Sequence, residues 1–440
     1  MEPVIHGGFT FESLGRGLLG LIVVLGIAWL CSDNRRKINW KLVGGGLLMQ
    51  FLLALAVLYV PFVERLFEWG GSLFIKVMDF TQSGMRFLLG PYADKTGSAG
   101  FVFLFHALPV VIFFSALVSL FYHWGIIQRI VSALAWVLRR FMKITGAEGL
   151  AVAGNIFLGM TESPVLIKNY LPRMNRSEIF LVMVAGMGTI AGSVMGTYIG
   201  MLGDTDPQAR LLFAKLLLSA SVMAAPASIV IAKMMCPQTE EVTDIITVTE
   251  EKRQANALGA LASGTMLGVR LFVNIAAMLL VFIALVSLMN YITEGIIGRY
   301  TGLNEWAAAV SSGKASGFSI QFILGLVTAP FMWLIGVPSP DIMPVGALLG
   351  EKTILNEFVA YSQLREWNAA GMFVYRKSVI MSTYILCGFA NISSIGILLG
   401  GLGVLAPEKR ESIARMGVPA LVGGTLVSLL SATVIGLILG

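Results

Sequence analysis

Eight apolar stretches, most of them long enough to cross a bilayer, constrain this chain more than any other feature. A helix needs about twenty mostly apolar residues to span the hydrocarbon core, where only helices and closed barrels satisfy every backbone hydrogen bond. The eight predicted spans are residues 18–31, 43–63, 101–121, 178–201, 211–235, 267–292, 378–402 and 417–439. The sequence therefore predicts an all-α polytopic membrane protein with eight transmembrane helices.

The composition agrees with a membrane protein. Hydrophobic residues make up 56% of the chain and charged residues 13%, whereas a soluble protein carries about 25% charge. A transmembrane barrel would show short alternating segments instead of long apolar runs. The net charge of +6 comes from short basic clusters beside the spans, so the bilayer is the expected partner and nucleic acid is not. Three cysteines and three histidines show no disulfide or metal-ligand spacing, and no cofactor is expected.

Two further intervals are amphipathic. Residues 64–100 and 126–143 mix charged side chains with apolar ones at helical spacing, which predicts helices that lie along the membrane interface. Basic clusters at residues 35–41, 129–143 and 409–415 favour a cytoplasmic place for these loops and put both termini outside, although Arg376 and Lys377 count against this orientation. The first span has no basic region before it and no cleavage site after it, which predicts that it is retained.

Two polar segments interrupt the apolar pattern. The first, GNIFLGMTESP at residues 154–164, contains Glu162 between glycines and a proline, and the second contains Glu357. An ionisable side chain in hydrocarbon is costly and is usually functional, and broken backbone at that depth must be buried in protein or line a cavity. The alternative for the first segment is a kinked span in which Glu162 pairs with a basic residue.

The two polar segments belong to an internal repeat. Residues 132–201 and 327–402 share an order of features, in which Glu162 follows Trp136 by 26 residues and Glu357 follows Trp333 by 24. One copy starts after three spans and the other after six, so the copies enter the membrane from opposite sides. This predicts an inverted-topology repeat with re-entrant helical hairpins at residues 147–172 and 341–364, the usual design of secondary transporters. A coincidence without inversion is the alternative.

Four strings carry a resemblance to a known family. They are GMTE at 159–162, AGMGTIAGSV at 185–194, GEKTILNEFVAY at 350–361 and CGFANISSIG at 387–396. At these residues, and in their order over residues 132–402, the chain resembles the concentrative nucleoside transporter family in its bacterial form. The resemblance implies sodium-driven nucleoside uptake across the inner (plasma) membrane by an elevator-type movement, in a homotrimer.

The resemblance also implies a division into a scaffold and a mobile transport domain. The predicted units are residues 1–125 with scaffold spans 1–3 and an interfacial helix, residues 126–235 with the first hairpin and spans 4–5, residues 254–317 with an interfacial segment and scaffold span 6, and residues 318–440 with the second hairpin and spans 7–8.

Family roles fall on twelve residues of this sequence. The resemblance implies that the nucleobase is contacted by Met160, Thr161, Glu162 and Val194. It implies that the ribose is held by Glu357, Asn391 and Ser394, with Phe389 near the base. It implies that side-chain and main-chain oxygens bind sodium at Asn155, Leu158, Thr189 and Ile190.

Side-chain chemistry supports these roles. A carboxylate with an amide can hydrogen-bond both hydroxyls of a ribose, and Ser394 lies one helical turn from Asn391. Oxygen ligands at a broken helix suit a hard monovalent cation. Other roles stay open: Asn391 could cap or bridge helices, Phe389 could simply pack, and the Thr189 hydroxyl could bond to its own helix.

Base preference and the coupling ion are not determined by the sequence. Glutamine is frequent in the family where this chain has Met160, and a thioether cannot supply the donor and acceptor of an amide. A proton-coupled symporter, in which Glu162 or Glu357 takes up the proton, is an alternative. An intramembrane enzyme is less well supported, because the glutamates come with no nucleophile–base pair, metal-ligand cluster or phosphate-binding loop. We therefore expect a transporter and not an enzyme.

Overall fold

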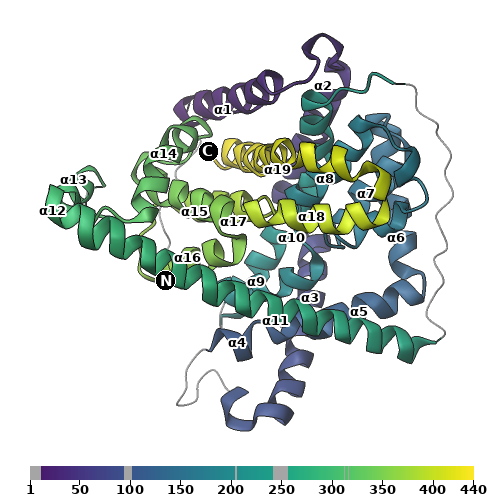
Figure 1. Ribbon diagram of the computed structural model, residues 1–440, viewed down its shortest axis with the longest axis horizontal. Coiled ribbons are helices and arrows are strands. Elements are labelled where there is room, and N and C mark those ends of the chain that lie inside the picture. The colour runs from purple at the N-terminus through teal and green to yellow at the C-terminus, as the bar shows by residue number, and fades with distance from the viewer. Residues whose placement is uncertain (1–10, 94–101, 204–205, 241–255, 312, 316) are drawn as a thin grey trace.

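The computed structural model describes residues 11–93, 102–203, 206–240, 256–311, 313–315 and 317–440. Every regular element within these ranges is a helix (Figure 1). The first ten residues lie outside the described ranges, so the location of the N-terminus outside the cytoplasm stays a prediction.

The chain begins with α1 (Phe11–Leu30), α2 (Trp40–Tyr59) and α3 (Pro61–Leu89). The first span starts earlier than predicted and has 20 residues, enough to cross a bilayer. Asn39 caps α2 by accepting a hydrogen bond from the Leu42 amide. The amphipathic helix predicted after the second span is α3, which packs along α10 (Pro207–Met235).

The third span and the second amphipathic helix follow as predicted. They form α4 (Phe103–His106), α5 (Pro109–His123) and α6 (Ile126–Met142). The last of these ends at Lys143, whose φ of 52° is the left-handed conformation that terminates helices.

The first polar segment folds into α7 (Gly146–Asn155) and two short 3-10 helices, Ser163–Ile167 and Leu171–Arg173. A capping box between Thr145 and Glu148 starts α7. The described returning half contains only these two 3-10 helices, each with a proline in its first turn, where no helical amide hydrogen is needed.

The fourth span is broken into α8 (Arg176–Gly188) and α9 (Gly192–Gly203), and α10 follows as one continuous helix. A second capping box, between Asn175 and Glu178, starts α8. The sixth span is α11 (Ala257–Asn290), which continues through the π-helical turn Tyr291–Gly298 into α12 (Arg299–Thr301). The separate helices α13 (Leu303–Val310) and α14 (Ile320–Leu334) follow.

The second polar segment folds into two consecutive helices, α15 (Ile342–Ile354) and α16 (Glu357–Ala369), which are separated by residues 355–356. The seventh span is also broken, into α17 (Arg376–Leu386) and α18 (Ile392–Leu405). The eighth is α19 (Arg410–Leu439), which begins seven residues before the predicted span and includes Arg410 and Arg415 of the basic cluster expected in the preceding loop.

The second polar segment and the two last spans lie in the centre of the molecule. Figure 1 shows α15, α17, α18 and α19 lying between α1 on one edge and the long α11 on the other. Around them, α8 packs against α10 and α19, and α5 packs along α11.

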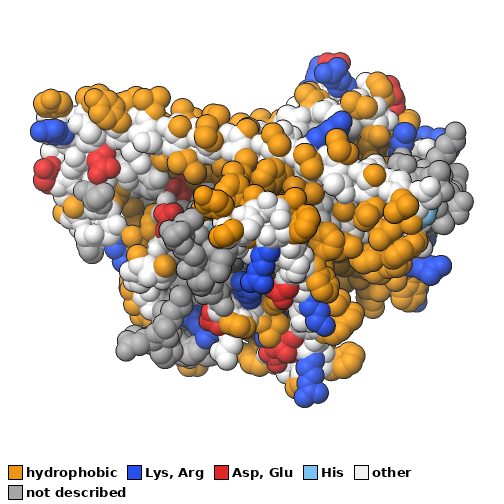
Figure 2. All heavy atoms as spheres, turned by 90° about the horizontal axis from the view of Figure 1, so that it is seen from below, with side chains coloured by type: hydrophobic (Ala, Val, Ile, Leu, Met, Phe, Trp, Pro, Cys, Tyr) orange, Lys and Arg blue, Asp and Glu red, His pale blue; other side chains and the backbone are white. Residues whose placement is uncertain are grey.

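Seven helical segments of the described residues are long and apolar enough to cross a membrane. The predicted seventh span is missing from this set because its break leaves two short helices. Hydrophobic side chains also cover much of the face seen in Figure 2, and Leu280 and Val281 on α11 are 73% and 56% exposed. Such a surface suits hydrocarbon and confirms a polytopic helical membrane protein.

Candidate functional site

The residues predicted to form the site lie at four helix interruptions. Asn155 ends α7, residues 189–191 separate α8 from α9, residues 355–356 separate α15 from α16, and residues 387–391 separate α17 from α18. Helix ends leave amides and carbonyls without intrahelical partners. Each interruption therefore offers backbone groups to a ligand or to another segment.

Two of these interruptions cross in direct backbone contact. The Phe389 amide donates a 3.2 Å hydrogen bond to the Thr189 carbonyl. The neighbouring Gly388 has a φ of +151°, and a Cβ added to it would lie 2.9 Å from the Met187 carbonyl oxygen. Only glycine permits this approach. The breaks of the fourth and seventh spans thus lie in direct contact. The Phe157 carbonyl, which follows α7, accepts from the Gly192 amide at the start of α9 and joins the first polar segment to the broken fourth span.

A buried hydrogen-bond network surrounds Glu357, the first residue of α16. Its Oε2 accepts a 3.0 Å hydrogen bond from Nδ2 of Asn391, and its Oε1 accepts one of 2.9 Å from the hydroxyl of Tyr198 in α9. Glu357, Asn391 and Tyr198 are 3%, 3% and 0% exposed. Two segments that are distant from Glu357 in the sequence therefore hold this carboxylate.

Asn391 has a double role. Its Oδ1 caps α18 by accepting from the Ser394 amide at 2.9 Å, and it also accepts from the Ser394 and Ser393 hydroxyls at 3.0 and 2.7 Å. Its amide nitrogen faces Glu357. The capping and bridging alternatives considered from the sequence are therefore both present, and they place Asn391 and Ser394 beside the carboxylate.

A buried lysine lies in the same hairpin as Glu357. Lys352 is fully buried in α15 and donates hydrogen bonds to the Ile385 carbonyl at 2.8 Å and to the Ser428 hydroxyl at 3.0 Å. Ile385 is in the last turn of α17, where a carbonyl has no helical partner. The ammonium thus stabilises the broken helix and places a positive charge in the region of Glu357.

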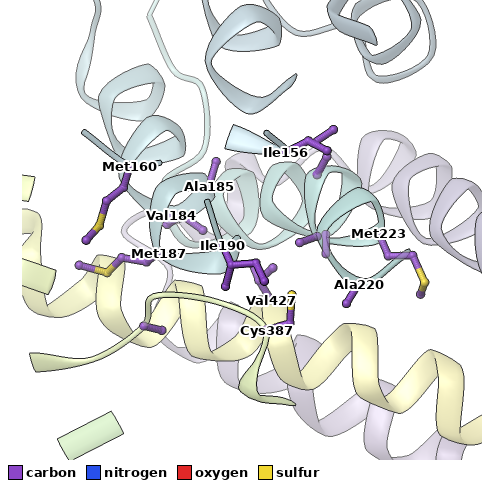
Figure 3. Close-up of a cluster of buried hydrophobic side chains, with 14 of the residues drawn as sticks. Ile156, Met160, Val184, Ala185, Met187, Ile190, Ala220, Met223, Cys387 and Val427 are labelled. Carbon is purple, nitrogen blue, oxygen red and sulfur yellow. The ribbon is translucent and has the colours of Figure 1, made fainter. Parts of the chain in front are cut away.

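The three predicted residues of the first hairpin differ in their surroundings. Met160 is buried and packs closely against Gly186, where an added Cβ would lie 2.8 Å from the Met160 Cβ. Figure 3 shows Met160 among the buried side chains between the repeats. Thr161 is exposed next to Gly401 of α18. Glu162 is half-buried, and its Oε2 accepts from the Gly159 amide of its own turn at 3.4 Å. It does not join the hydrogen-bond network of Glu357.

Two other predicted residues flank the crossing of the broken helices. Val194 is buried near the start of α9, and Phe389 is half-buried in the interruption before α18. The Phe389 amide donates its hydrogen bond to the Thr189 carbonyl. Its side chain packs on the edge of the hydrophobic core, so packing and base contact both stay open for it.

The predicted sodium ligands lie at the end of α7 and in the break between α8 and α9, two regions joined by the hydrogen bond from the Gly192 amide to the Phe157 carbonyl. The Asn155 side chain is fully buried, and neither its oxygen nor its nitrogen has a hydrogen-bond partner among the described residues. An unpartnered buried amide is costly, so the site suits a ligand that the amide oxygen can bind. Leu158, Thr189 and Ile190 are also buried.

The Thr189 hydroxyl hydrogen-bonds to its own helix, which is the alternative role that the sequence leaves open for this residue. Its hydroxyl donates to the Ala185 carbonyl at 2.8 Å, which leaves the oxygen lone pairs able to bind a cation. An amide oxygen, a hydroxyl oxygen and main-chain carbonyls form a donor set that fits a hard monovalent cation. The described residues contain no cluster of three His, Cys, Asp or Glu side chains that could hold a metal ion.

Sequence reasoning did not identify Tyr198 and Lys352. A signal was available for both, because a tyrosine hydroxyl or an ammonium inside a membrane span needs a polar partner. Lys352 lies within GEKTILNEFVAY and Tyr198 lies one turn after Val194. Their partners come from distant segments, so the sequence alone could not name them.

Three family models match this chain in consecutive regions. Residues 19–92 match the N-terminal model of Na⁺-dependent nucleoside transporters, and residues 216–436 match the C-terminal model. Residues 104–205, which include the first hairpin and the first broken span, match a model described as a gate for nucleoside recognition.

Relatives of known name match over nearly the whole chain. The nucleoside permease NupC of Helicobacter pylori is 34% identical, with 96% of this chain and 97% of the permease covered. The sodium/nucleoside cotransporter 1 of Rattus norvegicus is 35% identical over 95% of this chain and 63% of its own length. The structure of CNTnw in an inward-facing substrate-bound state superposes with a TM-score of 0.86 at 34% identity, covering 97% of this chain and 99% of CNTnw. The chain therefore belongs to the concentrative nucleoside transporter family and is a nucleoside transporter, not an enzyme.

Proposed function

We propose that this protein is a sodium-coupled symporter that concentrates nucleosides across the inner membrane. The observation that carries the proposal is the buried network of Glu357, Asn391 and Ser394 at the crossing of two broken helices. Ligand sites between broken helices of inverted repeats are typical of secondary transporters. The names of the matching family models support sodium as the coupling ion.

The ribose is the part of the substrate that Glu357 and Asn391 bind. A carboxylate offers about four lone-pair positions, of which Tyr198 and Asn391 occupy two. The remaining positions can accept hydrogen bonds from the two adjacent hydroxyls of a ribose. A charged acceptor makes such bonds stronger than neutral ones, by about a factor of two.

The nucleobase lies toward the first hairpin in this proposal. Thr161 and Glu162 supply a hydroxyl and a carboxylate for the polar edge of the base, and Val194 and Phe389 contact its faces. Met160 offers a soft apolar contact. Met160 stands where glutamine is frequent in the family, and its thioether cannot form the hydrogen bonds of that amide. The preference for one nucleobase therefore also depends on the residues around Met160.

Sodium binds at the end of α7, where Asn155 has an unused amide oxygen. Thr189 and the carbonyls of Leu158 and Ile190 complete the ligand set. The ion would bind the otherwise unpartnered amide oxygen of Asn155. Because Thr189 lies in the break between α8 and α9, ion binding is coupled to the geometry of that broken span. A proton-coupled mechanism through Glu162 or Glu357 is the competing proposal.

The larger-scale features are proposals as well. The transport domain comprises both hairpins and the broken spans, and it moves as an elevator against a scaffold that includes α11. The exposed apolar surface of α11 supports a contact with lipid or with other subunits of a homotrimer. Both termini lie outside the cytoplasm.

Uptake by proteoliposomes tests the proposal directly. Radiolabelled uridine and adenosine are offered under an inward sodium gradient, under an inward proton gradient, and under neither. Accumulation driven by sodium alone supports the sodium-coupled symporter. Accumulation driven only by the proton gradient would favour the competing mechanism and remove the ion role of Asn155.

A competition panel tests the division of the site. Unlabelled nucleosides, free bases and ribose are added against one labelled nucleoside. We expect intact nucleosides to compete best, because base and sugar contribute separate contacts. Equal competition by free bases would contradict a ribose contact at Glu357.

A further inference from the structure

Tyr198 is held rigidly at the side of Glu357 that faces α9. The tyrosine is fully buried, and its ring lies 4.8 Å from the ring of Phe358 and 4.5 Å from that of Tyr361. Such aromatic contacts stabilise the ring in this position. The hydroxyl therefore has a fixed place, from which it donates to Oε1 of Glu357 at 2.9 Å.

We propose that Tyr198 is a positioning residue for sugar recognition, an inference that depends on the proposed ribose role of Glu357. Tyr198 and Asn391 bind different oxygens of the carboxylate from α9 and α18. Together they set the rotation of the carboxylate, so that its remaining lone pairs point in fixed directions. Tyr198 thereby increases the preference for nucleosides that carry ribose hydroxyls.

The neighbouring buried tyrosines do not share this role. The Tyr361 hydroxyl donates to the Thr383 carbonyl at 3.0 Å, and the Tyr384 hydroxyl is 2.5 Å from the Ser219 hydroxyl. These contacts join helices and do not involve a carboxylate. Tyr361 is therefore a matched control, because it belongs to the same aromatic cluster and has an equally buried hydroxyl.

The test compares two substrates in three proteins. Uptake kinetics of a labelled ribonucleoside and of its 2′,3′-dideoxy analogue are measured in proteoliposomes containing the wild type, Tyr198→Phe or Tyr361→Phe. We expect Tyr198→Phe to raise KM for the ribonucleoside roughly tenfold, the size of effect of one hydrogen bond to a charged group. The dideoxy analogue lacks the hydroxyls, so its KM should change much less, whereas Tyr361→Phe should keep the wild-type ratio of the two KM values.

Different results would overturn the two proposals separately. If the wild type had equal KM values for both substrates, the ribose role of Glu357 would fail. If the wild type discriminated and Tyr198→Phe kept the same ratio, or lost both activities equally, the positioning role alone would fail. Substrate-induced shifts of the melting temperature in detergent repeat the comparison on folded protein only, so that a loss of folded material cannot imitate the expected result.

Discussion

The Phe389 amide and the Thr189 carbonyl are joined by a 3.2 Å hydrogen bond that connects the breaks of two helices from different repeats. The bond uses one donor and one acceptor that regular helices would have satisfied internally. Each break therefore stabilises the other through this hydrogen bond, and the polar residues beside the two breaks are held close together.

Gly388 is expected to tolerate no side chain at this crossing. Gly388→Ala would place its Cβ 2.9 Å from the Met187 carbonyl oxygen at a φ that alanine rarely adopts. We expect a loss of roughly 1–3 kcal/mol in the free energy of unfolding and a strong fall in uptake, measured by thermal unfolding and by transport. Gly396→Ala is the control: it lies in α18 with no atom within 4 Å of the added Cβ, and should be neutral or stabilising by up to about 1 kcal/mol.

Asn391→Ala should abolish most transport. It removes the cap of α18 and the amide donor to Glu357, so uptake at limiting substrate should fall by at least about tenfold. Asn256→Ala removes a cap from the start of α11, where Asn256 accepts from the Gly259 amide. That control should cost about 1 kcal/mol of stability but retain uptake. Near-normal uptake by Asn391→Ala would remove this residue from sugar binding.

Asn155→Leu should separate sodium binding from folding. Because both polar atoms of the side chain lack partners, an apolar residue of similar size should leave stability in potassium buffer unchanged or raise it by about 1 kcal/mol. Sodium should no longer raise the melting temperature or stimulate uptake.

A conservative change at the same site provides the control. Thr189→Ser keeps the hydroxyl that bonds to Ala185 and should retain the sodium response. A sodium-dependent melting temperature in Asn155→Leu that matched the wild type would place the coupling ion elsewhere.

Met160→Gln should change the ratio of purine to pyrimidine uptake. The substitution adds an amide donor and acceptor at a buried position near the crossing of the repeats. Met160→Leu keeps an apolar side chain of similar volume and should preserve the ratio. Competition of adenosine and uridine for one labelled substrate measures both variants, and an unchanged ratio in Met160→Gln would exclude this residue from base recognition.

The sequence by itself determined the fold class and two of the four helix interruptions at the site. The breaks in the fourth and seventh spans, predicted as continuous over residues 178–201 and 378–402, appeared only in the structure. Runs of about twenty apolar residues can satisfy their backbone only as helices in a bilayer, and the polar, glycine-containing segments around Glu162 and Glu357 cannot continue such runs. These are local properties, readable from residue type and spacing. The family strings added which side chains to consider.

Only the tertiary structure decided which polar groups meet. Glu357 is bound by Tyr198 and Asn391 from two other segments, while Glu162, which the sequence presents as its equivalent, bonds within its own turn. The α15–α16 hairpin has two helices and the first hairpin returns through 3-10 turns. Such pairings depend on how helices that are distant in the sequence pack in three dimensions. The spacing of residues along the chain carries no information about which of these helices come into contact.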